Sequence, residues 1–376
     1  MRTHFTLLFI IITACFQVSG QDSLILVKMN DEAFAALERS DTSVIEKANL
    51  LLEESEKSGK PSVFGINAHT ILGIVSKDKG YYITSLNHYL KALNQAKSIK
   101  DEGRTSACYN NIGTVYQLQN NFVKSREYFE LSLDIEETLG APLQKSIRLY
   151  NLGEVYAKMD SFSLALSYFN SSLIIEKDLG NLEGEIYALL GITDVYIKVN
   201  RNPDAWILLD EISDKLETHQ VEEKILYSKL KGKLLFKEGR LDEALSAFKI
   251  AESTSHKTGF RIHLLDIYLA QIPLLKKQEK WKEVVKTYDK YSSLKDQLNT
   301  LKVKNQLEDL TFQNTLNQKE LELKLIQDEK DLALENQKIE KSTSNHRQKV
   351  VWFLIGSIIF LVALSIFGIR KLSQRS

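Results

Sequence analysis

The sequence predicts an all-α fold: a solenoid of about six helix pairs with a period of about 40 residues, then a long charged helix and one transmembrane helix. Two observations predict the solenoid. A small residue recurs about every 40 positions, and an amphipathic stretch begins nine positions after each one. The column reads Gly73, Gly113, Gly153, Thr193 and Gly232, and its last member is the larger Ile272. Repeats of about 20–50 residues stack because no single unit can bury its apolar face alone.

Each repeat divides into two helices. We expect the second helix to begin nine positions after the column, at Tyr82, Phe122, Phe162, Asn202, Leu241 and Trp281. Twelve positions after it, a second small column reads Ser85, Ser125, Ala165, Ala205, Ala244 and Val284. Small residues on both helices allow them to approach closely in an antiparallel pair. The last repeat pairs Ile272 with Val284, which indicates wider packing in a terminal repeat.

Short motifs recur around these columns. Asn111-Ile112-Gly113 precedes Tyr116, Asn151-Leu152-Gly153 precedes Tyr156, and Leu241-Asp242-Glu243-Ala244 precedes Phe248 and Ala251. These motifs resemble the tetratricopeptide repeat, and the resemblance covers about residues 63–298. It implies a solenoid that binds peptides or proteins. The usual period of that family is about 34 residues, so this chain is expected to have longer helices or loops. Residues 21–62 are predicted to form a degenerate helix pair, with Asp41, Thr42 or Ser43 as an N-cap.

The first helices of the pairs are expected to line a concave groove that binds the partner. The predicted groove residues are Asn110, Thr114, Gln117, Tyr150, Glu154, Lys158, Tyr187, Asp194, Lys198, Lys229, Lys233 and Lys237. Tyrosines among polar groups suit peptide recognition, although a merely solvated inner wall is the alternative. Some members of the family clamp a peptide carboxylate with a Lys/Asn/Asn/Lys/Arg set. Only Asn111 and Asn151 match that set, so the clamp is not predicted.

Both ends of the chain indicate a membrane protein. Residues 1–20 are predicted to be a signal peptide, because a short apolar run ends in small residues before Gln21. The alternative is a lipoprotein box in which Cys15 is lipidated. Residues 350–369 form an uncharged run of 20 residues, the length of a transmembrane helix. The repeats are then expected outside the cytoplasm, with residues 370–376 as a cytoplasmic tail.

Residues 299–349 are predicted to form a long charged helix. They are rich in Leu, Glu, Lys and Gln, which favour helices. A heptad seam starts at Leu294, Leu298 and Leu301 but is interrupted at Asn305 and Glu308. Two interpretations stay open: a solvated single helix or flexible stalk, and a weak parallel homodimer through residues 299–345.

The composition argues against catalysis and against nucleic-acid binding. The chain has 49 basic and 49 acidic residues, and no basic stripe with interleaved aromatics. It contains no nucleotide-binding, hydrolase or zinc-protease motif, and no His or Cys spacing typical of a metal site. We therefore predict no cofactor and no metal. The acid pairs Glu136-Glu137 and Glu222-Glu223 are interpreted as solvated helix faces. Cys108 is expected to be a buried apolar residue, with a reactive thiol as the alternative.

The predicted function is a non-catalytic, membrane-anchored tetratricopeptide protein that binds a peptide or protein partner outside the cytoplasm, as a scaffold or assembly factor. The alternative is the sensor component of a signalling system. The order of parts resembles the sensor half of bacterial membrane histidine kinases and regulators, without their output domain, which would then lie on a separate protein. His346 does not replace a phospho-acceptor helix.

Overall fold

The computed structural model of the protein describes residues 21–39, 41–57, 59–216, 221–258, 261–298 and 355–357. All regular structure in these residues is helical, so the prediction of an all-α fold is confirmed. The chain divides into two units, Met1–Leu310 and Thr311–Ser376, and the helices described below belong to the first.

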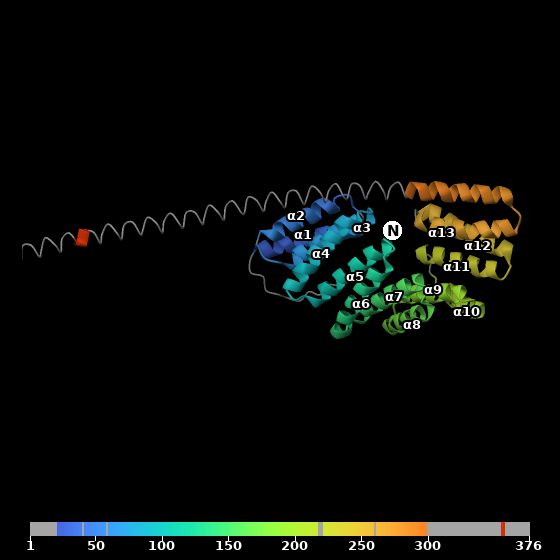
Figure 1. The fold of residues 1–376 in the computed structure, drawn as a ribbon, viewed down its shortest axis with the longest axis horizontal. Helices are drawn as coiled ribbons and strands as arrows, with labels where there is room; N and C mark the ends of the chain where they lie inside the picture. The colour runs from blue at the N-terminus through green and yellow to red at the C-terminus, as the bar shows by residue number, and fades with distance from the viewer. Residues whose placement is uncertain are drawn as a thin grey trace, which may run out of the picture. The chain divides into compact units, whose positions relative to one another are not determined.

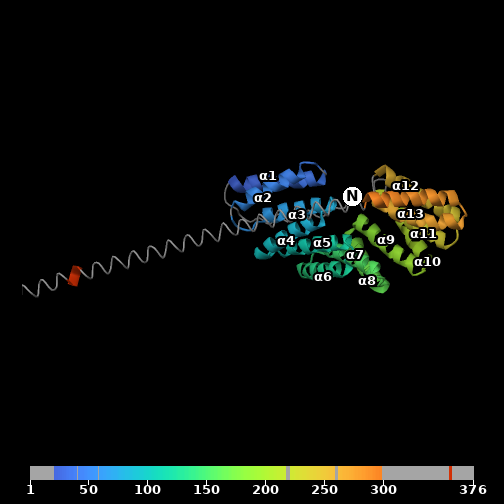
Figure 2. The same ribbon diagram turned by 45° about the horizontal axis from the view of Figure 1, so that its top comes forward.

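Consecutive helices form antiparallel pairs that lie side by side in chain order (Figures 1 and 2). The helices are α1 (Gln21–Glu38), α2 (Val44–Glu56), α3 (Val63–Asp78), α4 (Tyr82–Ser98), α5 (Glu102–Leu118), α6 (Phe122–Leu139), α7 (Pro142–Lys158), α8 (Phe162–Leu179), α9 (Leu182–Lys198), α10 (Asn202–Lys215), α11 (Val221–Lys237), α12 (Leu241–Thr258) and α13 (Arg261–Lys277). Residues 281–298 form a further helix, which pairs with α13. The solenoid of helix pairs predicted from the repeat is confirmed.

The predicted helix starts are also confirmed. Helices α4, α6, α8, α10 and α12 begin at Tyr82, Phe122, Phe162, Asn202 and Leu241, and the last helix begins at 281. The long period comes from long helices, because α5 has 17 residues, α6 has 18, and the turns between them are only two or three residues long.

Left-handed residues close these short turns. They are Gly80, Lys100, Asn120, Gly140, Asp160, Gly180, Asn200, Gly239 and Glu279, nearly all at steps of 20 or 40. After each of these residues except Gly140, the next backbone N–H bonds back into the finished helix; the Asn121 N–H, for example, donates to the Tyr116 carbonyl at 2.9 Å. This is the Schellman arrangement, which satisfies the last carbonyls of a helix. The second helix of each pair therefore starts after a fixed interval.

An aromatic ring explains why the first helix needs glycine. A Cβ at Gly153 would lie 2.6 Å from the ring of Phe169, which is buried on α8. The same conflict arises between Gly113 and Phe129 and between Gly232 and Phe248. The ring therefore occupies the space of a missing side chain, and we call this contact the ring-in-notch contact.

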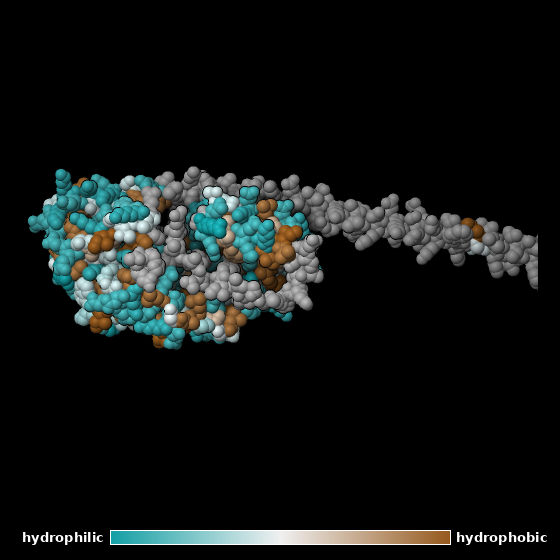
Figure 3. Space-filling view, turned by 180° about the vertical axis from the view of Figure 1, so that it is seen from behind, coloured by the Kyte–Doolittle hydropathy of each residue, from teal (hydrophilic) through white to brown (hydrophobic). Residues whose placement is uncertain are grey.

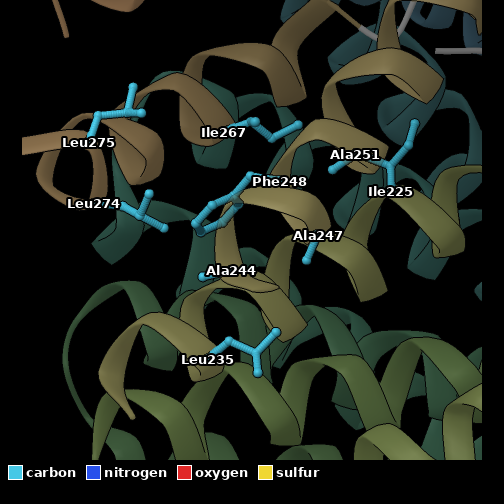
Figure 4. Close-up of a cluster of buried hydrophobic side chains, with 9 residues drawn as sticks. All are labelled: Ile225, Leu235, Ala244, Ala247, Phe248, Ala251, Ile267, Leu274 and Leu275. Carbon is cyan, nitrogen blue, oxygen red and sulfur yellow. The ribbon is translucent and has the colours of Figure 1, made fainter. Parts of the chain in front are cut away.

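The same ring also holds the next pair. A Cβ at Gly191 on α9 would lie 2.7 Å from Phe169, so one ring packs against the first helices of two successive pairs. Figure 4 shows the corresponding arrangement around Phe248, whose ring lies among Leu274 and Ile267 from α13 and Ala244 from its own helix.

The fifth pair replaces this contact with a different combination of sizes. Thr193 occupies the glycine position of α9, and Leu209 occupies the ring position of α10. Both side chains are fully buried. A larger residue in the notch is thus accompanied by a smaller one opposite, which keeps the total volume similar, as close packing requires.

The N-terminal residues form an ordinary packed helix pair. Ala33 and Ala36 of α1 pack with Ala48 and Leu51 of α2 and with α3 in one buried cluster. Ser43 stands at the N-cap position of α2, but its side chain makes no capping hydrogen bond. Asp41 instead accepts a hydrogen bond from the Ser43 backbone N–H at 2.9 Å.

The predicted localisation, a single-pass membrane protein with exported repeats, is wrong. In the residues that the structure describes, no helix has both the length and the apolar character needed to cross a bilayer. A crossing helix needs about 20 mostly apolar residues, whereas the described helices have at most 18 and present charged faces. Hydrophilic residues cover much of the face shown in Figure 3. The predicted signal peptide, the charged segment 299–349 and all of 350–369 except 355–357 lie outside the described residues.

The ring-in-notch contact can be tested by transplanting the combination of the fifth pair (α9 and α10) into the fourth pair (α7 and α8). Gly153→Thr should destabilise the protein by roughly 1–3 kcal/mol, because the new side chain collides with Phe169. The double variant Gly153→Thr/Phe169→Leu should lose less unfolding free energy than the two single variants lose together, by about 1 kcal/mol or more. Urea unfolding of the four proteins measures this coupling.

A matched pair provides the control. Gly153→Thr combined with Phe248→Leu joins residues in different clusters, so their effects should add to within about 0.5 kcal/mol. Equal coupling in both pairs would contradict the contact.

Candidate functional site

The predicted groove residues lie on the first helices of successive pairs and contact one another between pairs. At the N-terminal end of the groove, the Asn151 Nδ2 on α7 donates a hydrogen bond to Asn110 Oδ1 on α5 at 2.8 Å. Thr114 instead donates to the Asn110 carbonyl of its own helix at 3.0 Å. Gln117 lies partly buried on the same helix.

The middle of the groove carries two tyrosines. Tyr150 on α7 meets Tyr187 on α9 edge to face, with 6.1 Å between ring centroids, and lies 5.5 Å from the ring of Phe169. Burial raises the pKa of Tyr150, and the nearby carboxylates of Glu154 and Glu222 raise it further. Both phenols stay neutral at ordinary pH and present partly exposed rings.

A row of lysine and aspartate side chains crosses from α9 to α11. Asp194 accepts from Lys233 at 3.0 Å and from Lys198 at 3.1 Å, one lysine on each carboxylate oxygen. Burial alone would raise the pKa of Asp194, but these two lysines outweigh it and hold the pKa well below its usual range. Lys237 donates to the Ile197 carbonyl and to Asn200 Oδ1.

The charged row continues to the neighbouring helices. Lys229 on α11 lies 3.4 Å from Asp266 on α13. Burial lowers the pKa of Lys229, and repulsion from Lys233 lowers it further, while Asp266 opposes the change. On α7, burial raises the pKa of Glu154, and the nearby charge of Lys158 partly offsets this increase. Lys229 and Lys233 therefore repel each other, and the aspartates Asp194 and Asp266 only partly balance their charges.

The structure therefore brings the predicted residues of α7, α9 and α11 into one continuous surface. Sequence reasoning missed three of its members. Asp266 pairs with Lys229, Asn200 accepts from Lys237, and His263 lies 3.0 Å from Glu222. Asp266 and His263 lie on α13. The groove positions were counted from the glycine of each repeat, and α13 has Ile272 in its place. The spacing to the preceding pair could have identified Asp266, because it lies 37 residues after Lys229.

A second polar cluster is buried between α5, α6 and α7. Arg148 is 1% exposed; its Nε donates to Ser132 Oγ at 2.7 Å, and its terminal nitrogen lies 3.2 Å from Glu136 Oε1. Ser106 donates to the same carboxylate oxygen at 2.5 Å. Burial lowers the pKa of Arg148 to about 10, although Glu136 opposes the change.

This cluster repeats one period later without the arginine. Ser146 pairs with Ser172 at 2.8 Å and donates to Glu176, whose other oxygen accepts from Asn181 at 2.7 Å. The interpretation of the acid pairs as solvated faces is wrong for Glu136, which is 2% exposed, and for Glu223, which is 4% exposed. It holds for Glu137, which is exposed. The clusters join neighbouring helices, and removing one partner of such a buried pair is costly because the other charge is left unpaired.

Two histidines meet between α3 and α4. His69 Nδ1 and His88 Nδ1 lie 3.2 Å apart, so one ring donates and the other accepts. Burial lowers the pKa of His69 to about 3 and that of His88 to about 4, and repulsion from Lys91 lowers both. Among the described residues, no group of three His, Cys, Asp or Glu side chains could hold a metal ion. Cys108 is 1% exposed, and burial raises the pKa of its thiol to about 12.

Comparisons with known proteins agree on the fold. A family model described as tetratricopeptide repeat matches residues 66–138, which lie on α3 to α6. The crystal structure of the apo form of RapI superposes with a TM-score of 0.62 and 15% identity, covering 73% of this chain and 99% of that one. Residues 66–138 therefore match the tetratricopeptide repeat, and the similar structure shows a related fold over most of the chain.

Two further solved structures are similar. A Rap protein complexed with competence and sporulation factor has a TM-score of 0.55 and 14% identity, covering 76% of this chain and 90% of that one. NprR in complex with its cognate peptide NprX has a TM-score of 0.54 and 14% identity, covering 77% and 84%. No curated protein matches the chain by sequence. The resemblance to membrane kinase sensors stays a prediction.

The histidine pair should make the protein sensitive to acid. Both folded-state pKa values lie below the ordinary value near 6.5, so the unfolded chain binds more protons between about pH 6.5 and 4. Stability is therefore complete above that window and falls as pH is lowered through it. Between pH 7 and pH 5, the double variant His69→Gln/His88→Gln should lose less unfolding free energy than the parent, by about 4 kcal/mol, or roughly 2 kcal/mol for each histidine.

Urea unfolding at the two pH values measures this difference. Equal losses in parent and variant would show that other groups cause the acid sensitivity.

Proposed function

We propose that this chain is a non-catalytic interaction protein that binds an extended peptide, or a segment of a protein, along the surface formed by α7, α9, α11 and α13. A scaffold and a signalling receptor would share this binding step. One observation carries the proposal. The Tyr150–Tyr187 pair lies next to Asp194 and to the lysines, Lys198 and Lys233, that bind this aspartate.

The two parts of this surface suit different parts of a peptide. Tyrosine rings supply large contact area at low entropic cost. The lysines of α9 and α11 outnumber the acids with which they pair. Lys198, Lys229 and Lys233 pair with Asp194 and Asp266, whereas Lys237 donates to the uncharged Asn200. Lys233 keeps a third of its side chain exposed, so a ligand can reach it. The ligand is thus a peptide with an apolar or aromatic side chain close to a carboxylate.

The similar structures support this choice of ligand class. NprR is described in complex with its cognate peptide, on a fold that covers most of this chain. At 14% identity this likeness concerns the fold, so the residues that contact a peptide in this chain come from its own geometry. Those residues join the predicted groove with Asp266, which sequence reasoning missed.

A random 12-residue peptide library selected against the full chain provides the test. Enriched peptides should carry Asp or Glu, and Lys233→Ala should weaken their binding about tenfold, or 1.4 kcal/mol. Binding should also weaken as salt is raised, since exposed charges are screened. Titration calorimetry measures the Kd values.

The control is Lys249→Ala on α12, an exposed lysine away from the row. It should leave the Kd unchanged. Melting curves of both variants verify that each is folded. Enriched peptides that bind the Lys229→Ala/Lys233→Ala variant as tightly as the parent would place binding elsewhere. Enrichment without acidic residues would contradict the lysine role and leave the tyrosine role to be tested by Tyr187→Ala.

A further inference from the structure

One acid of the candidate surface has no partner among the residues that the structure describes. Glu154 lies on α7, one turn after Tyr150, and is partly buried. No described residue forms a hydrogen bond or an ion pair with its carboxylate. Lys158, one turn further along the helix, acts on Glu154 only through its charge and is itself exposed. The carboxylate of Glu154 therefore keeps its capacity to accept hydrogen bonds from another molecule.

The repeat explains why this acid is unpaired. Glu154 and Asp194 are 40 residues apart and occupy the same position in two successive first helices. Asp194 pairs with Lys198 of its own helix and with Lys233, which has this position in the next first helix. For Glu154, the next residue in this position is the acid Asp194, and the preceding one is Thr114, which donates to its own helix. Neither neighbour therefore supplies a positive charge to Glu154 from this position.

The surrounding charges leave Glu154 in need of a cation. Burial raises the pKa of Glu154, and the charge of Asp194 raises it further. Lys198 and Lys229 lower this pKa through their charges, but they form their ion pairs with Asp194 and Asp266. A further positive charge beside Glu154 would favour the ionised carboxylate and offset the effects of burial and of Asp194.

The tyrosine pair lies close to the same carboxylate. Among the charged groups that raise the pKa of Tyr150, Glu154 has the largest effect. Tyr150 in turn meets Tyr187 edge to face, with 6.1 Å between ring centroids. Aromatic rings attract lysine and arginine side chains through their electron-rich faces. A basic side chain bound to Glu154 would therefore also find an aromatic contact.

We propose that Glu154 binds a lysine or arginine side chain of the peptide on the candidate surface, in the role that Lys233 has beside Asp194. This inference rests on the proposed function and adds a second charge to the ligand. The bound peptide carries a basic side chain near α7 and a carboxylate near α11. This order of charges also sets the direction of the ligand, because a reversed ligand would bring like charges together.

A matched pair of peptides tests this contact with the full chain. A peptide enriched from the 12-residue library is made with arginine at its basic position and with citrulline, which is similar in shape but uncharged. The parent chain should bind the arginine form about tenfold more tightly, because the citrulline form loses a charge-assisted hydrogen bond. In Glu154→Gln the ratio of the two Kd values should fall to about two or less. Titration calorimetry of the four combinations measures this coupling.

Two controls separate the charge of Glu154 from other effects. Glu127→Gln on α6, at an exposed acid outside the surface, should keep the tenfold ratio. Lys233→Ala should weaken both forms alike and also keep the ratio, because Lys233 acts on the carboxylate of the ligand.

Charge reversal provides a second variant. Glu154→Lys should bind a form of the peptide with glutamate at the basic position more tightly than the arginine form. Melting curves verify that each variant is folded.

The role of Glu154 and the proposed function fail in different ways. An unchanged ratio in Glu154→Gln would overturn the role of Glu154 and leave peptide binding at Lys233 in place. Enrichment of acidic peptides without a recurring lysine or arginine would have the same meaning. Peptides whose binding is unaffected by substitutions at either Glu154 or Lys233 would overturn the proposed function as well.

Discussion

The structure depends on one contact, in which a large side chain of the second helix fills the notch left by a small residue on the first helix, as in the pairs from α3–α4 to α11–α12. Without a Cβ at Gly153 the two helices of a pair approach closely, and the ring of Phe169 fills the space. Because that ring also meets Gly191, each pair is tied to the next by the same side chain that closes it. Repeat proteins gain stability from such nearest-neighbour interfaces, so the contact sets both the local hairpin and the continuity of the stack.

The candidate binding surface follows from this arrangement. Holding successive first helices at a constant phase brings residues about 40 positions apart into contact, such as Asn110 with Asn151 and Asp194 with Lys233. Side chains from three or four helices then share one wall, although none is close in sequence. The last pair departs from the pattern because Ile272 replaces the glycine and Tyr288 remains exposed. One rule of packing thus explains the order of the stack and the distinct character of its end.

The sequence was sufficient for features that depend on spacing. The starts of α4, α6, α8, α10 and α12 follow from the period, because each turn has nearly the same length. The glycine column was located correctly, but its reason was only half identified. Ser85 does reach the Gly73 carbonyl, at 2.8 Å, yet the ring four residues later is what requires glycine. A column of residue types does not reveal which side chain fills a space.

Features that depend on three-dimensional surroundings were not predictable. Glu136 looks like a solvated acid in a helix, and only the packing of α5 and α7 around it buries it with Arg148. Asp266 escaped the groove prediction because its repeat lacks the reference glycine. The localisation prediction rested on terminal segments outside the described residues, and the described helices are too short and too charged to support it.

Hydrogen exchange tests the central claim most directly, because it reports the stability of each helix separately. In Phe169→Ala, the backbone amides of α7, α8 and α9 should lose the most protection, and the loss should decline with distance towards α2 and α12. That pattern is expected if one ring joins two successive pairs. An equal loss along the whole stack, or unchanged protection of α9, would contradict the account.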